Sequence, residues 1–356
     1  MRGEKLRHSG WYRGVLIIAY ILGAAFIFTM WATDTREFIG FNGYYKARFA
    51  EMIEGTAYKP FVYRMLVPLL VRGGRVLLPS PLEQFLREEV YRLIPFVGQV
   101  MDYLAWEREL LPEYLLASCF MYAALLGFLF LLQRLTLRLY ALPLYLADGA
   151  PLIALGVLPV FFKRGTHFLY DLPALFFFTW GLMLILEERL KCYYLCFALG
   201  LLNKETMVLL SLVFALHFAK RLTRGELGRH LGVQLGLLVL VRSAQVFLYW
   251  GNPGGAFEFH LIENLRLALR PYWYSAVVSV LSVVLLIGHG WDKKPRFLKQ
   301  SLWIGVPLVG SYLVMGAWGE IRVFYELFPV LFLLALPTVA EILGWPMSAR
   351  EYKFES

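Results

Sequence analysis

Residues 14–32 read GVLIIAYILGAAFIFTMWA and carry no charged side chain. A run of this length is long enough to cross the hydrocarbon core of a bilayer as a helix. Over its 356 residues the chain is 59% hydrophobic and only 17% charged, with a mean hydropathy of +0.58. Soluble domains are about 45–50% apolar and about 25% charged. The composition therefore indicates a polytopic membrane protein and excludes a disordered chain or an ordinary soluble enzyme.

The apolar character recurs along the whole chain and predicts an all-α bundle of about ten transmembrane helices in a single membrane domain, residues 1–356. Apolar segments follow the first one at 112–132, 142–161, 169–186, 192–203, 206–219, 231–249, 272–290, 301–318 and 323–344. The segments 192–203 and 206–219 are short for a crossing, so the helix count around 192–219 stays open. The first segment lacks a small-x-small cleavage site and is longer than a signal peptide requires, which favours an uncleaved helix.

The distribution of Lys and Arg predicts that both termini are cytoplasmic. With the N-terminus inside, the inner segments hold eighteen Lys and Arg, whereas the short outer loops hold six. Those six are Lys163, Arg164, Lys204, Arg266, Arg270 and Arg322. This asymmetry follows the positive-inside rule, and it predicts a multi-pass protein of the plasma (inner) membrane. The net charge of +9 indicates that Lys and Arg side chains contact anionic lipid headgroups. No nucleic-acid partner is expected.

A long first loop, residues 33–111, is predicted on the outer side. Six apolar residues recur there at helical spacing and predict one amphipathic helix in the interface plane: Phe41, Tyr44, Tyr45, Phe49, Met52 and Ile53. The stretch YKPFVYRMLVPLL, residues 58–70, predicts a second interfacial helix, in which Arg64 shares one face with Arg72 and Arg75. Residues 81–111 are expected to add one or two surface helices.

Isolated charges on the predicted outer face are the candidate functional residues, because charge near the membrane is expensive without a role. Asp34 follows the first helix and suits a general base for an incoming hydroxyl, although Thr-Asp-Thr also suits a helix cap. Asn203-Lys204-Glu205 interrupts a long apolar stretch, so it either lines a cavity where Lys204 meets a phosphate or forms a solvated turn.

Two further segments fall on the same predicted face. Arg322, in GEIRVFYELFP (319–329), has the planar fork that grips a phosphate; the alternative is a Glu–Arg pair that only fixes the loop. Asp171 is either a second carboxylate of the site or a partner of the helix N-terminus. No metal-ligand spacing is found, so neither a metal nor another cofactor is expected.

The order of these features resembles the GT-C superfamily of integral membrane glycosyltransferases. In that family an acidic residue follows the first helix, in a large loop with two interfacial helices; Asp34 matches this position, and Glu37 is the second choice. The stretch 60–68, with Arg64, resembles the proline-bearing second interfacial helix, and GLLNKET (200–206) resembles a Gly-Leu-x-x-x-Lys element. Arg322 with Pro329 resembles the last-helix element at the carrier phosphate. Tyr170-Asp171-Leu-Pro173 also recurs in membrane proteins of this general kind.

The resemblance implies an inverting transfer of a sugar from a polyprenyl-phosphate donor to a glycan or lipid acceptor. Asp34 or Glu37 would be the base, and the substrate-binding residues would be Arg64, Tyr170, Asp171, Lys204, Glu205 and Arg322. The chain departs from the family in lacking a paired acidic motif in the first loop and a soluble C-terminal domain. Two other classes remain open: a transporter or flippase, which also uses interrupted helices, and a non-enzymatic assembly protein.

Overall fold

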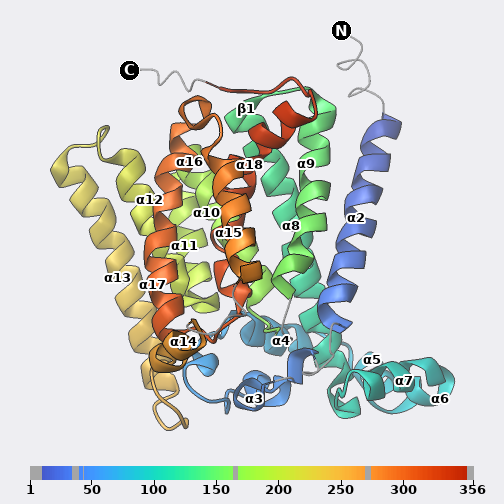
Figure 1. Ribbon diagram of the computed structural model, residues 1–356. Coiled ribbons are helices and arrows are strands. Elements are labelled where there is room, and N and C mark those ends of the chain that lie inside the picture. Colours follow the sequence, from blue (N-terminus) through green and yellow to red (C-terminus); the bar gives the residue numbers. More distant parts are fainter. Residues whose placement is uncertain (1–9, 34–39, 43, 163–166, 269–273, 351–356) are drawn as a thin grey trace.

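The computed structural model describes residues 10–33, 40–42, 44–162, 167–268 and 274–350, and within these ranges the chain is mostly helical (Figure 1). Four of the described helices are long and apolar enough to cross a membrane: Gly10–Thr33, Arg108–Leu139, Leu144–Phe162 and Arg224–Leu248. They contain α2 (Gly10–Thr33), α8 (Leu111–Leu139), α9 (Leu144–Val157) with η6 (Leu158–Phe162), and α13 (Arg224–Leu248). The structure thus confirms a mostly helical chain with helices that are long and apolar enough to span a membrane.

Shorter helices complete the bundle, and most of them lie along the remaining expected apolar segments, whereas Arg296–Ser301 is polar. They are α10 (Asp171–Leu186), α11 (Leu190–Asn203), η7 (Glu205–Val208) with α12 (Leu209–Phe218), α15 (Tyr274–Gly288), α16 (Arg296–Ser301), η10 (Leu302–Ile304), α17 (Gly305–Met315) and α18 (Phe328–Ile342). The chain does break at Lys204, which has extended backbone angles between α11 and η7. A Cβ atom at Gly200 would lie 2.4 Å from Met207 Cε, so this glycine lets the chain fold back tightly there.

The core lies between α8, α10 and α11, whereas the outer helices present apolar side chains outward. Phe128, Phe178 and Tyr193 are fully buried. By contrast Phe247 on α13 and Leu285 on α15 are 83% and 71% exposed. Large exposed apolar faces of this kind suit contact with lipid tails rather than with water.

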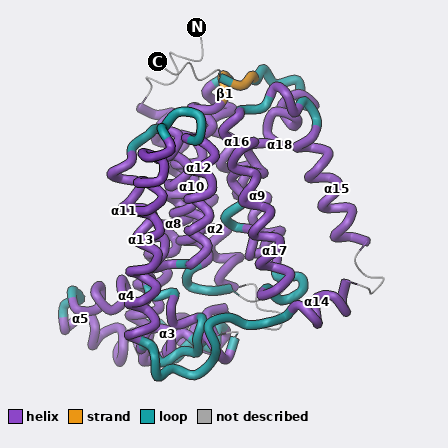
Figure 2. The backbone as a smooth tube through the Cα atoms, turned by 90° about the vertical axis from the view of Figure 1, so that its left-hand side faces the viewer, coloured by secondary structure: helices purple, strands orange, loops and turns teal. Residues whose placement is uncertain are grey.

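The first loop folds into short helices that cover one end of the bundle (Figures 1 and 2). These elements are η1 (Gly40–Asn42), η2 (Tyr45–Ala47), α3 (Phe49–Glu54), η3 (Phe61–Tyr63), α4 (Leu66–Val76), α5 (Ser80–Gln84), η4 (Phe85–Glu89), α6 (Val90–Leu93), α7 (Pro95–Tyr103) and η5 (Arg108–Leu110). We call this the loop end. Where one or two surface helices are expected over 81–111, the structure has five short helical elements, from α5 to η5.

The single amphipathic helix expected over 41–54 is wrong. Arg48 has extended backbone angles, and the Phe49 N–H donates to Asn42 Oδ1 at 2.9 Å, so the helix begins only at Phe49. Tyr45, expected on the buried face, is 57% exposed. The side chain of Asn42 thus replaces the backbone acceptor that a continuous helix would supply.

The single helix expected over 58–70 is also wrong. Arg64 lies between η3 and α4 with φ −87° and ψ 66°, outside helical geometry. It therefore does not share a helix face with Arg72 and Arg75, which both belong to α4.

A short strand pair, absent from the all-α expectation, marks the opposite end. β1 (Tyr140–Ala141) pairs antiparallel with β2 (Ser348–Ala349), with Tyr140 opposite Ala349. α2 begins at this end as well (Figure 1). We call it the strand end.

Candidate functional site

All six of the sequence-predicted substrate-binding residues lie in one largely buried network at the loop end, in which the Glu205 side chain is the most accessible, at 34% exposed. The first part of it is centred on Arg64. Its guanidinium lies 2.8 Å from Glu205 Oε1, stacks 4.2 Å above the Tyr170 ring and donates to the Tyr170 hydroxyl. Burial opposes the charge on Arg64, but the Glu205 carboxylate outweighs it and raises the pKa of Arg64. Arg64 has non-helical backbone angles just before α4, and its side chain extends to Glu205 at the start of η7.

The second part is centred on Arg322, within η11 (Ile321–Phe324). Its Nη1 lies 3.1 Å from Asp171 Oδ1, and its Nη2 donates to Glu320. Asp171 is fully buried, begins α10 and also accepts the Phe168 N–H at 3.0 Å. Asp171 therefore lies in the charged cluster and fixes the Phe168 backbone just before α10.

The third part joins Lys204 to Glu326, which stands just before α18. Lys204 Nζ lies 2.8 Å from Glu326 Oε1 without the alignment of a hydrogen bond. Thr206 donates its hydroxyl to the same carboxylate, and Asn203 Nδ2 donates to the Tyr170 carbonyl at 2.9 Å. Lys204 is 5% exposed, so the alternative of a solvated turn is wrong for this residue.

Arg242 and Gln245 on α13 extend the network beyond the six predicted residues. Gln245 is buried, donates to the Tyr63 carbonyl at 2.8 Å and accepts from Arg242 at 3.0 Å. The Arg242 guanidinium stacks 4.7 Å above the Tyr63 ring. The sequence shows Arg242 as a charged residue inside an apolar helix, which indicates a functional or structural role. The sequence does not show that its partner is Tyr63 in the first loop.

The cations of the cluster are balanced by carboxylates, yet several buried polar atoms have no hydrogen-bond partner among the residues that the structure describes. The unpaired atoms are Arg322 Nε, Glu326 Oε2, Asn203 Oδ1, Tyr325 Oη and His167 Nε2. Native interiors rarely leave such atoms unpaired. A concentration of them around Lys204 and Arg322 favours a site for a polar ligand over a purely structural ion-pair network.

His167 links this cluster to the end of α2. Its ring centroid lies 5.2 Å from that of Trp31, three residues before Asp34. Burial and then the nearby Arg322 charge lower the pKa of His167 to about 3. The imidazole is therefore neutral in the folded protein.

We predict that the folded protein loses stability in mild acid through His167. The unfolded chain takes up a proton near pH 6.5, whereas the folded His167 does so only near 3. Above pH 6.5, His167 should not change the free energy of unfolding. Below pH 6.5, that free energy should fall by about 1.4 kcal/mol per pH unit, which makes roughly 2 kcal/mol near pH 5. Unfolding of the wild type and of His167→Gln across this range tests it. A pH slope equal in both proteins would contradict the assignment.

The two candidate bases, Asp34 and Glu37, lie outside the described residues. Among the residues that the structure describes, no group of three or more His, Cys, Asp or Glu side chains is placed to hold a metal ion.

Comparisons of the chain with protein-family models, with curated proteins and with solved structures give no match.

Proposed function

We propose that the chain is a GT-C-like membrane glycosyltransferase that moves a sugar from a polyprenyl-phosphate donor to a glycan or lipid acceptor. In this proposal the helices cross the plasma (inner) membrane about ten times, with both termini cytoplasmic. The loop end then faces outward, and no cofactor besides the lipid-linked sugar takes part. The observation that carries the proposal is the buried cluster at the loop end, where Lys204 and Arg322 meet unpaired polar atoms.

A phosphate must compete with carboxylates for these cations. Asp171 and Glu326 are fully buried, whereas the side chain of Glu320 is 18% exposed. Glu320 is therefore the carboxylate that can move away most easily. Arg322 would then offer two parallel N–H donors, including the unpaired Nε, to a phosphate.

The chemistry that fits this geometry is a single displacement at the anomeric carbon. Asp34, or Glu37 in its place, accepts the proton of the acceptor hydroxyl as its oxygen bonds to that carbon. The bond from the carbon to the phosphate oxygen breaks with inversion, and the electron pair leaves on the polyprenyl phosphate. Lys204 and Arg322 stabilise the charge that develops there, and a phosphate is already a good leaving group.

The packing of α10 favours a transferase over a transporter. Its residues between the two ends of the bundle, among them Leu175, Phe178 and Leu182, are fully buried. This apolar packing separates the cluster from the strand end, whereas a transporter needs a route between both sides. The gathering of the charges in one cluster also argues against an assembly protein with charges scattered over separate surfaces.

Binding of polyprenyl phosphate tests the proposal without knowledge of the sugar or the acceptor. The variant Lys204→Gln/Glu326→Gln removes one buried cation and its own counter-charge together, so no lone charge is left inside. We expect radiolabelled polyprenyl phosphate to bind this variant about tenfold to a hundredfold more weakly than wild type.

The matched control is Arg134→Gln/Glu187→Gln, which removes the 2.7 Å ion pair between half-exposed Arg134 on α8 and Glu187, the residue that follows α10. Its affinity for the lipid should equal that of the wild type. Equal affinity in all three proteins, or no saturable binding to the wild type, would remove the basis of the proposal.

A further inference from the structure

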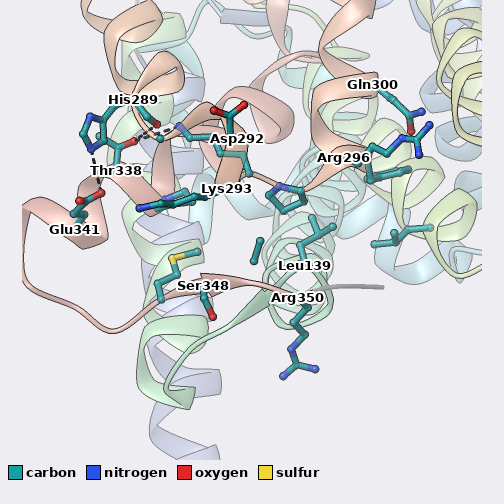
Figure 3. Close-up of a pocket in the computed structure, with 18 of the residues that line it drawn as sticks. Leu139, His289, Asp292, Lys293, Arg296, Gln300, Thr338, Glu341, Ser348 and Arg350 are labelled. Carbon is teal, nitrogen blue, oxygen red and sulfur yellow. Dashed lines mark hydrogen bonds and ion pairs between the residues drawn. The ribbon is translucent and has the colours of Figure 1, made fainter. Parts of the chain in front are cut away.

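A cavity of about 1130 Å³ lies at the strand end, where the proposed function gives it no role. It is enclosed by the ends of α8, α10, α12 and α18, by η9 (Trp291–Lys293) and α16, and by the β2 segment (Figure 3). Leu186, at the last position of α10, lines it, while Asp171 of the loop-end cluster holds the first. At about 1.5 Å per residue the two sites are some 22 Å apart along α10.

The lining of the cavity is strongly basic. Six of its residues are Lys or Arg: Lys220, Arg221, Lys293, Lys294, Arg296 and Arg350. Its two acidic residues are Asp292 and Glu341, and Glu341 contacts His289 at 3.1 Å. Charges of one sign around a concave surface reinforce one another and favour an anion inside.

Most of these cations have no carboxylate partner. Within the described ranges, Lys220, Lys293, Arg296 and Arg350 form no ion pair. Arg221 pairs instead with Glu188 outside the cavity. Lys294 is buried, and among the described residues its ammonium donates to the Leu286, Ile287 and Leu334 carbonyls and the Thr338 hydroxyl.

The rest of the wall combines polar residues, among them Gln300, Thr338 and Ser348, with apolar ones. Leu139, Pro337, Trp345 and Met347 contribute to it. Figure 3 shows Lys293 and Arg296 on one side of the cavity and Ser348 and Arg350 on the other. Basic pockets between helices at the membrane boundary suit phosphate-bearing headgroups, and the apolar part of the wall suits the part of such a molecule next to the phosphate.

We propose that this strand-end cavity binds a phosphate group, either that of an anionic phospholipid or a free phosphate. The cluster at the loop end and the proposed transfer reaction do not enter this inference, so each can fail without the other. The grouped cations favour a phosphate group as the ligand. The two arms of the experiment distinguish a phospholipid headgroup from free phosphate.

The lipid arm uses the full-length protein reconstituted in mixed phosphatidylcholine and phosphatidylglycerol and then extracted, with the retained lipids measured by mass spectrometry. We expect the wild type to retain phosphatidylglycerol in excess over the mixture, and Lys293→Gln/Arg296→Gln to lose about tenfold of that preference. The matched control is Arg224→Gln/Arg229→Gln on α13, which removes the same charge near the same end but outside the cavity. It should keep the preference.

The second arm titrates inorganic phosphate by calorimetry into the same three proteins in phosphatidylcholine alone. Binding lost only in Lys293→Gln/Arg296→Gln identifies a free-phosphate site, whereas a response in the lipid arm alone identifies a headgroup site. Two results would overturn the proposal: no difference between wild type and the cavity variant in either arm, or an equal loss in the control variant. Unfolding midpoints of all three proteins check that the fold is kept.

Discussion

Arg322→Gln is expected to lower the free energy of unfolding by about 3–5 kcal/mol, the usual effect of leaving one partner of a buried ion pair without its counter-charge. Asp171 is 0% exposed, and Arg322 Nη1 at 3.1 Å is its paired cation. The guanidinium also stacks 4.1 Å from the Phe168 ring, a contact that glutamine does not replace. Equilibrium unfolding in mixed micelles measures the change.

The double variant Arg322→Gln/Asp171→Asn is the internal control for this prediction. Because it removes both charges, it should be clearly more stable than Arg322→Gln alone, with a coupling energy of about 1–3 kcal/mol. Strictly additive effects of the two substitutions would show that the two side chains do not form an ion pair in the folded protein.

Asp34→Asn is expected to reduce the rate of sugar transfer by about a hundredfold to ten-thousandfold, the usual range for loss of a general base. Asparagine keeps the shape of the side chain but does not accept a proton, so the unfolding midpoint and the binding of polyprenyl phosphate should stay at wild-type values. The measurement is the initial rate of transfer from a radiolabelled donor at saturating concentration.

Glu37→Gln serves as the matched variant for the choice of base. If Asp34 is the base, Glu37→Gln should transfer sugar at nearly the wild-type rate, and the reverse pattern would assign the role to Glu37. Full activity in both single variants and in the double variant would mean that neither carboxylate acts as the base.

The sequence predicts the helical membrane-type architecture because long apolar runs have few other stable forms. Residues 14–32 lie within α2, and the break at Lys204 follows from three polar residues in an apolar stretch. The same reasoning finds Lys204 and Arg322, since charge in such surroundings stands out. These signals are local, and a single sequence carries them.

Features that depend on distant partners could not be predicted in this way. The helix expected through Arg64 gives way because that residue pairs with Glu205, 141 positions later. The helix expected over 41–54 is broken where Asn42 supplies a local hydrogen bond to Phe49. The basic cavity combines residues from 139 to 350, and no short segment of the sequence contains enough of it to be recognised. Periodicity alone reveals neither the distant pairing of Arg64, nor the local side-chain bond of Asn42, nor the assembly of the cavity.

The most direct test of the loop-end cluster as a catalytic site is sugar transfer by the purified protein in vesicles. The donor is radiolabelled polyprenyl-phosphate sugar, and the acceptor is a membrane extract that contains envelope glycans and lipids. The account predicts that label moves from donor to acceptor with inverted anomeric configuration, and that Lys204→Gln/Glu326→Gln abolishes this movement while Arg134→Gln/Glu187→Gln does not. Transfer no faster than in protein-free vesicles, or equal in all three proteins, would contradict it.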